Sequence, residues 1–208
     1  MSTIATPASP TRPPVRQVED DEVLLRLSVE QYHVMIQSGV FSDDERVELL
    51  EGLLVTKMPK NPAHVTAKRL LLRALEAVLP VGWFVDSQEP LTTSDSEPEP
   101  DLGVIQGDFN NYTDHHPGPS DSALIVEIAD SSLRRDRGRK KRVYSRASVP
   151  VYWIVNLVDR QIEVYTDPTG PGETPDYRHH DDFRPGTSVP VVIDGKEVGR
   201  LDVAKLLP

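Results

Sequence analysis

The chain has 208 residues, no cysteine and a formal net charge of −10. This length favours one globular domain with tails, and the missing thiols exclude disulfides, zinc–thiolate sites and cysteine nucleophiles. The negative charge argues against indiscriminate binding to nucleic acid, because such binding rests on an excess of Lys and Arg. The sequence has no apolar run of about 20 residues and no secretory leader pattern, so we expect a cytoplasmic protein that does not enter a membrane.

The N-terminal segment differs in composition from the rest of the chain. Residues 1–22 are rich in Pro, Ser and Thr and then acidic, which predicts a disordered tail. Residues 23–208 are expected to form a single domain. Ser28 and Gln31 make a capping box, which predicts a helix directly after Ser28. Its apolar face is expected to consist of Val29, Tyr32 and Ile36.

The middle of the chain alternates between strand and helix patterns. Two strands are predicted in 46–56 around the turn at Glu51 and Gly52. A core helix is predicted from the Asn61 cap to the stop at Pro80. The other expected elements are strands at 83–85, 101–105 and 123–128, a basic helix at 136–148, and strands at 151–155, 161–165 and 189–193. This order predicts a mixed α/β layer structure, with β-hairpins added at both ends.

Glu127 stands out because it lies in a run that is otherwise apolar on both alternating faces, as in a central strand. A buried carboxylate is costly unless it is paired, protonated or bound to a cation. One interpretation is a structural ion pair with an arginine of the basic helix, and the other is a functional site.

Asp101 favours the functional interpretation. It begins the preceding strand directly after Pro100, although by itself it is typical of a turn or cap residue. If the two strands are neighbours, Asp101 and Glu127 meet at one end of the sheet. Their carboxylates and a backbone carbonyl such as that of Ile128 would form the oxygen-rich site that Mg²⁺ prefers.

The basic helix supplies candidate cations. Helical spacing places Lys140 on the stripe that packs on the sheet, with Lys141 as the second choice. Arg139 and Arg142 fall elsewhere on the helix; they are either a solvated face or, together with Lys141, contacts to phosphates.

These fragments, in this order and spacing, resemble the restriction-endonuclease-like PD-(D/E)XK nuclease superfamily and, within it, the Uma-type restriction endonuclease family. The resemblance covers nearly everything from about Leu27 onward. It is carried by 46–52, 99–101, 126–131, 136–144 and 149–155.

The resemblance implies a restriction-endonuclease-like mixed β-sheet flanked by helices. It also implies that Lys140 replaces the superfamily's usual lysine, because Ala129 stands two residues after Glu127. It assigns Glu48 to the site, where the residues alone indicate only a hairpin carboxylate. Gln88 is a further candidate for lining the site. The histidines, including His64 in the first turn of the core helix, are interpreted as ordinary polar residues.

The leading hypothesis is a DNA endonuclease that depends on Mg²⁺, with Mn²⁺ as a possible substitute, and that acts as a homodimer, as the resemblance suggests. Asp101, Glu127 and the carbonyl of Ile128 would hold the metal. Lys140 would orient or help deprotonate the attacking water and stabilise developing charge. The first alternative is a non-catalytic module that keeps the nuclease-like fold to bind nucleic acid or protein. The second is a purely structural ion-pair network.

Overall fold

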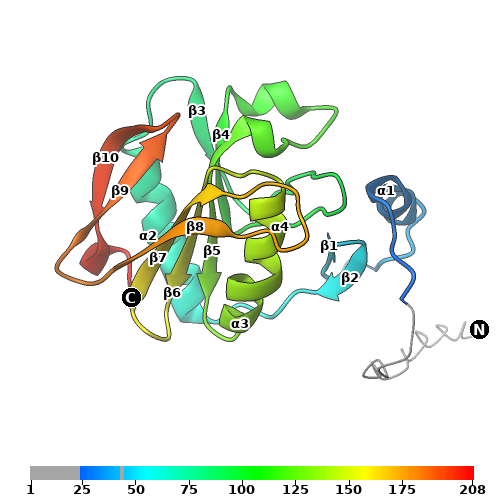
Figure 1. The fold of residues 1–208 in the computed structure, drawn as a ribbon, viewed down its shortest axis with the longest axis horizontal. Coiled ribbons are helices and arrows are strands. Elements are labelled where there is room, and N and C mark those ends of the chain that lie inside the picture. Colours follow the sequence, from blue (N-terminus) through cyan, green and yellow to red (C-terminus); the bar gives the residue numbers. More distant parts are fainter. Residues whose placement is uncertain (1–23, 43–44) are drawn as a thin grey trace, which may run out of the picture.

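The computed structural model describes residues 24–42 and 45–208, so the predicted disordered tail lies outside the described residues. A six-stranded sheet forms the centre, in the order β3-β4-β5-β6-β7-β8 (Figure 1). β5 and β6 are parallel, and the other neighbours are antiparallel. The strands are β3 (Trp83–Asp86), β4 (Leu102–Gln106), β5 (Ser122–Ala129), β6 (Val151–Asn156), β7 (Gln161–Pro168) and β8 (Tyr177–Phe183).

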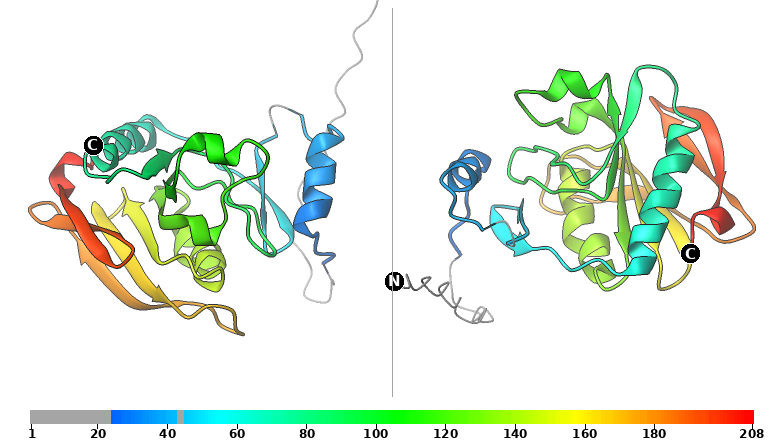
Figure 2. Two further views of the ribbon diagram at one scale, coloured as in Figure 1. Left: turned by 90° about the horizontal axis from the view of Figure 1, so that it is seen from above. Right: turned by 180° about the vertical axis from the view of Figure 1, so that it is seen from behind.

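Helices cover both faces of this sheet (Figure 2). α2 (Pro62–Glu76) packs through Ala67, Leu71 and Leu75 on the face that carries Val126 and Ile128. The opposite face, with Ile125 and Tyr152, is covered by α4 (Lys141–Arg146) through Tyr144. Burial on both faces explains why β5 reads as a continuous apolar run in the sequence.

Two hairpins and one helix complete the fold. β1 (Val47–Leu50) pairs with β2 (Leu53–Thr56), and α1 (Val29–Gln37) packs on β1. β9 (Ser188–Ile193) pairs with β10 (Lys196–Asp202) and closes the core on the α2 side. Short 3₁₀ turns are η1 (Phe109–Tyr112), η2 (Pro119–Asp121) and η4 (Val203–Lys205). No helix within the described residues is both long and apolar enough to cross a bilayer.

The local signals at the starts of two helices are confirmed. Ser28 and Gln31 form the capping box of α1. Asn61 accepts from the His64 amide at the start of α2, and Pro62 occupies its first turn. The hairpin turn is also confirmed, since Glu51 and Gly52 both have positive φ.

Three expectations were wrong. The basic helix begins at Leu133, not Asp136, because the Ser132 hydroxyl binds Asp136 Oδ2 and draws Asp136 inside a helical segment. Ile36 of α1 is 47% exposed, because α1 packs through its Val29–Tyr32 face alone. The strand β8 was missed, since its exposed residues lack alternation and pairing with β7 supplies its order.

Candidate active site

Three carboxylates from separate elements meet at the end of β5. The pairing of Leu102 with Val126 places Asp101, which precedes β4, beside the peptide that follows Glu127. Asp101 Oδ2 accepts a hydrogen bond of 2.9 Å from the amide of Ile128. Glu48 comes from β1, where hairpin pairing and the core hold it fully buried. The sequence-predicted Asp101, Glu127 and Glu48 therefore lie in one cluster.

Lys140 joins two of these carboxylates. Its Nζ lies 2.7 Å from Glu127 Oε1 and 3.0 Å from Glu48 Oε2, and its side chain is only 2% exposed. The inward direction expected from helical spacing is therefore the one observed. Within the crowded cations of this segment, Lys140 is the one that reaches Glu127.

A π turn shapes the helix that carries this lysine. Residues Asp136–Lys140 form the turn between α3 (Leu133–Arg135) and α4. Such turns insert an extra residue into a helix and are frequent at functional sites. The turn buries both Asp136 and Lys140. Sequence reasoning treated Asp136 only as a helix start and so missed its place beside the site.

Tyr144 is a second residue that sequence reasoning assigned only to the core. Its hydroxyl donates to Glu127 Oε1 at 2.7 Å. Lys140 donates to the same oxygen, so Glu127 Oε2 receives no hydrogen bond from the described residues. This arrangement anchors one oxygen of Glu127 and leaves the other for a ligand.

His64 and Lys60 contact Asp101, and both were missed. His64 Nε2 lies 3.0 Å and Lys60 Nζ 3.1 Å from Asp101 Oδ1. The signal for His64 was its position on the buried stripe of α2, in helical register with Ala67, Leu71 and Leu75. Lys60 precedes the helix and carried no comparable signal.

Burial and charge separate the pKa values of the carboxylates. Burial raises the pKa of Glu127 to about 8, and the Lys140 charge offsets this only in part. Burial also opposes ionisation of Asp101, but the hydrogen bond and charge of His64, the charge of Lys60 and the Ile128 amide hold its pKa well below its usual range. For Glu48, burial again opposes ionisation, but the charge and hydrogen bond of Lys140, with the charges of Arg135 and Lys57, lower its pKa.

Lys140 keeps its proton in this environment. Burial disfavours its charge, yet Glu127, Glu48 and Asp136 together raise its pKa above the usual value. The buried cluster therefore contains a charged lysine opposite one firmly ionised carboxylate, Glu48, and one that takes up a proton readily, Glu127. Such a divergence of carboxyl pKa values is typical of functional sites.

The cluster opens into a recess of about 50 Å³, here called the carboxylate recess. Its wall contains Asp101, Glu127, Ile128 and Lys140, with cations at Lys57, Lys60 and Arg135. Three buried polar atoms beside it have no hydrogen-bond partner: Glu48 Oε1, Asp136 Oδ1 and Arg135 Nε. Arg135 lies 3.9 Å from each of the two oxygens, beyond hydrogen-bond distance, and a bound cation would satisfy them more closely.

The oxygen ligands at the recess fit a hard divalent cation if a backbone carbonyl and water complete the set. In the part of the chain that the structure describes, no three His, Asp or Glu side chains converge to hold a metal by themselves. Carboxylates of Asp101 and Glu127 would therefore need the Ile128 carbonyl and water as further ligands, which is ordinary for Mg²⁺. The surplus of buried carboxylates over cations favours such an ion.

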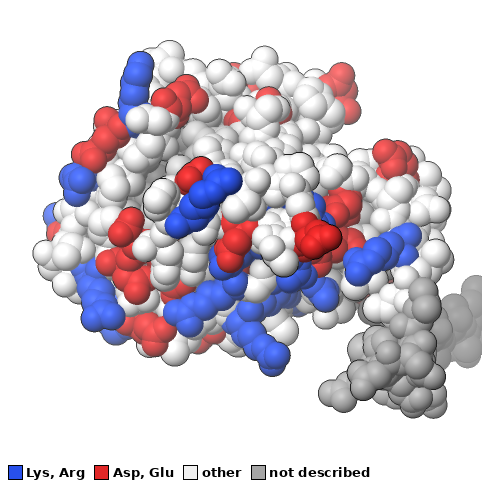
Figure 3. All heavy atoms as spheres, viewed as in Figure 1, with Lys and Arg blue, Asp and Glu red and all other residues white. Residues whose placement is uncertain are grey.

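The remaining predicted cations do not reach the recess. Arg142 makes a double hydrogen bond to Glu51 at 2.7 and 2.6 Å, and Arg139 lies 3.8 Å from the same carboxylate. Lys141 pairs with Asp176 at 2.7 Å. Figure 3 shows Lys and Arg interspersed with Asp and Glu on this side of the molecule rather than gathered in a separate patch.

Gln88 also lies apart from the site. It follows β3 with a positive φ and lines a different small cavity, together with Pro100 and Gly103. The suggestion that Gln88 lines the carboxylate recess is therefore wrong, because the chain turns away from the recess at this residue.

The fold and the carboxylate–lysine cluster together define a restriction-endonuclease-like α/β protein. Residues 29–194 match the Uma2 family, described as "Putative restriction endonuclease", and the chain belongs to this family. The resemblance predicted from the sequence is confirmed.

A solved structure supports the same fold. It is described as that of a "putative nuclease belonging to DUF820" from Anabaena variabilis ATCC 29413, and it matches with a TM-score of 0.62 and 13% identity. The match covers 86% of this chain and 97% of the other. At this identity the likeness establishes the fold alone. No curated protein matches the chain.

Proposed function

We propose that this protein is an endonuclease that hydrolyses phosphodiester bonds of DNA with Mg²⁺, for which Mn²⁺ would substitute. One observation carries the proposal: Lys140 lies 2.7 Å from Glu127 and 3.0 Å from Glu48, next to the recess that Asp101 lines. Membership of a family described as "Putative restriction endonuclease" supports it. As in the sequence-based hypothesis, we propose a cytoplasmic homodimer, since cutting both strands calls for two sites.

Each residue has a defined part in the proposed reaction. Asp101, Glu127 and the Ile128 carbonyl would hold Mg²⁺, which supplies polarisation of the phosphate and neutralisation of developing charge. Lys140 and Tyr144 both donate to Glu127 Oε1, which leaves Glu127 Oε2 to face the metal and the attacking water.

Lys140 stays protonated, so its role is to orient that water and stabilise the charge that develops on the phosphate. This differs from the base role considered from the sequence, because three neighbouring carboxylates hold its proton. Lys60 and Arg135, at the recess wall, would hold the phosphate backbone.

A non-catalytic nuclease-fold module is the second candidate. It is favoured by the ion pairing of Lys140 on two sides and by the pairing of Arg139, Lys141 and Arg142 with internal carboxylates. Under this alternative the protein binds nucleic acid or another protein without turnover.

Cleavage of plasmid DNA with Mg²⁺ or Mn²⁺ tests the proposal. We expect Asp101→Ala, Glu127→Ala and Lys140→Ala each to lose activity by about 100-fold or more. Asp181→Ala removes a carboxylate from exposed β8 and serves as the control with unchanged activity. Circular dichroism checks that each variant is folded.

Calorimetric titration with Mg²⁺ separates the two candidates. Saturable binding that is lost in Asp101→Ala supports a metal-dependent enzyme. Unchanged cleavage in all three site variants would rule out the site. Absence of both cleavage and saturable metal binding in the wild type would favour the non-catalytic module.

A further inference from the structure

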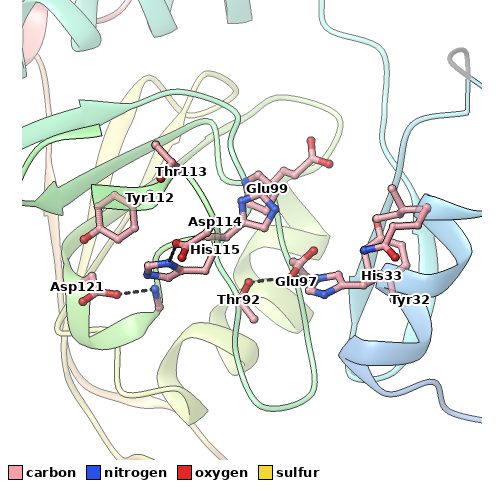
Figure 4. Close-up of a pocket in the computed structure, with 15 residues that line it drawn as sticks. Tyr32, His33, Thr92, Glu97, Glu99, Tyr112, Thr113, Asp114, His115 and Asp121 are labelled. Atoms are coloured by element: carbon pink, nitrogen blue, oxygen red, sulfur yellow. Dashed lines mark hydrogen bonds and ion pairs between the residues drawn. The ribbon is translucent and has the colours of Figure 1, made fainter. Parts of the chain in front are cut away.

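A much larger pocket adjoins the carboxylate recess. It measures about 970 Å³ and lies between α1 and the segment 112–121, with the 90–99 segment at its floor (Figure 4). Glu99 lines both this pocket and the recess. The Glu99 amide also donates to Glu48 Oε2 at 3.3 Å, so the two cavities share a piece of backbone. The two cavities therefore adjoin at Glu99.

Aromatic rings line the pocket from both sides. His33 of α1 and His116 approach with ring centroids 6.5 Å apart. Tyr112 and His115 form a second ring pair at 5.5 Å on the wall opposite α1. Base rings stack readily on such side chains, and each stacked base strengthens binding measurably.

The charges of the two cavities are divided. The lining of the carboxylate recess includes cationic side chains beside its carboxylates, namely Lys57, Lys60, Arg135 and Lys140. The pocket is lined by carboxylates and by no Lys or Arg from the described residues. At the junction, the Glu99 carboxylate is paired with Lys57. An anionic phosphate would therefore meet Lys and Arg side chains in the recess but none in the described lining of the pocket.

Hydrogen-bond acceptors in the pocket favour a group rich in donors. Asp121 and Asp114 lie on its wall, and the Asp114 side chain is 86% exposed. His115 contacts Asp114 Oδ1 and the Gly118 amide donates to Asp121 Oδ2, so the second oxygen of each carboxylate is the acceptor for a ligand. Carboxylates accept hydrogen bonds from exocyclic amino groups of bases, as Asp and Glu do from cytosine. Thymine has no exocyclic amino group.

We propose that the pocket between α1 and the 112–121 segment binds an unpaired nucleobase that carries an exocyclic amino group, next to the phosphate held in the carboxylate recess. The proposal rests on the proposed nuclease function for the placement of the phosphate. The aromatic rings hold the base plane, and Asp121 and Asp114 select for its amino group. The division of charge matches the two parts of one nucleotide.

Binding of fluorescein-labelled single strands of dC, dA or dT, in EDTA so that no metal-dependent cleavage occurs, tests the pocket directly. We expect the dC and dA strands to bind about tenfold more tightly than dT at equal salt. Tyr112→Ala should weaken dC and dA binding about tenfold and leave dT binding nearly unchanged. Asp121→Asn should reduce the preference for dC over dT.

Phe109→Ala is the matched control, because Phe109 is 69% exposed on the same short turn as Tyr112 but does not line the pocket. Equal affinity for dC, dA and dT, or equal effects of Tyr112→Ala and Phe109→Ala, would overturn the proposal. A third outcome would also overturn the proposal: no oligonucleotide binds, but a lysine-rich peptide binds and its binding is lost in Tyr112→Ala.

This readout is independent of cleavage. If the wild type cleaves DNA but shows no preference among dC, dA and dT, the base-binding proposal is contradicted and the proposed nuclease function is not. A base preference without any cleavage in Mg²⁺ contradicts the proposed catalysis and leaves the pocket supported.

Discussion

Two regions of the molecule combine acidic and basic residues. In one region the charged groups are buried, and in the other they are partly exposed and paired. In the carboxylate recess, Lys140 is buried among Glu48, Glu127 and Asp136, and two carboxylate oxygens there have no hydrogen-bond partner. On the exposed side of the same helix lies the cation-rich face, formed by Arg139, Lys141, Arg142 and Arg146. There Glu51 receives hydrogen bonds from both Arg142 and Arg146.

The difference shows what burial adds to charge. Around Lys140, the buried carboxylates outnumber this one buried lysine, so the pKa values of these groups are shifted and a bound cation would be stabilised there. On the cation-rich face, every cation is partly exposed and has a carboxylate partner, so water screens these ion pairs more than those around Lys140. A run of arginines in the sequence therefore marks charge density, while the site depends on the single buried lysine.

The largest expected effect concerns that lysine. Lys140→Ala leaves Glu48 and Glu127 buried without their cation, and we expect a loss of about 3–5 kcal/mol in the free energy of unfolding. Urea denaturation in EDTA measures it. Lys141→Ala, which breaks only the partly exposed pair with Asp176, should cost less than about 1 kcal/mol. Equal losses in the two variants would contradict the comparison.

Removal of the Tyr144 hydroxyl should have the next largest effect. Tyr144→Phe takes one donor from Glu127 Oε1, and we expect a loss of about 1–3 kcal/mol in unfolding free energy. A double-mutant cycle with Glu127→Gln isolates the contact. Strict additivity of the two substitutions would show that the hydroxyl does not act through Glu127.

Glu163 is an intermediate case, since it is fully buried but bound by Arg137, Asn156 and Tyr165. Burial raises the pKa of this carboxyl, but these hydrogen bonds outweigh burial and lower it below 4.5. A lowered folded-state pKa gives stability that is present above the unfolded value and lost as pH falls through the folded one.

Glu163→Gln should therefore differ from the wild type at pH 7 and approach it as pH drops below about 4.5. We expect a change of about 1 kcal/mol, since Arg137 is partly exposed. Urea denaturation between pH 3 and 7 measures it, with exposed Glu173→Gln as the control. A difference that stays constant across this range would contradict the prediction.

The smallest effect is expected on the cation-rich face. Glu51→Gln removes the charge of the carboxylate that Arg142 and Arg146 share, so both arginines can bind phosphate. We expect DNA affinity to rise about two- to fivefold. The slope of the logarithm of the binding constant against the logarithm of salt concentration should steepen by the equivalent of about one phosphate contact. Fluorescence anisotropy at several salt concentrations measures both. Asp181→Asn removes the same formal charge from exposed β8 and controls for net charge. An equal rise in both variants would mean that net charge alone is responsible.

Local patterns predicted much of the fold. The caps at Ser28 and Asn61, the Glu51–Gly52 turn and the apolar run of β5 each depend on neighbouring residues, so they were visible in the sequence. β8 was not visible, because its order comes from pairing with β7 rather than from its own residues.

The same division applies to the site. Sequence by itself determined that Glu127 is buried, that Asp101 begins a strand and that Lys140 points inward, because strand and helix periods decide which way a side chain faces. The tertiary structure decided that the strands of Asp101 and Glu127 are neighbours. Only the tertiary structure decided that His64, Lys60 and Tyr144 contact these carboxylates and that the arginines are paired with Glu51. Those contacts join residues far apart in the chain, and distance in space is set by packing of whole elements rather than by local pattern.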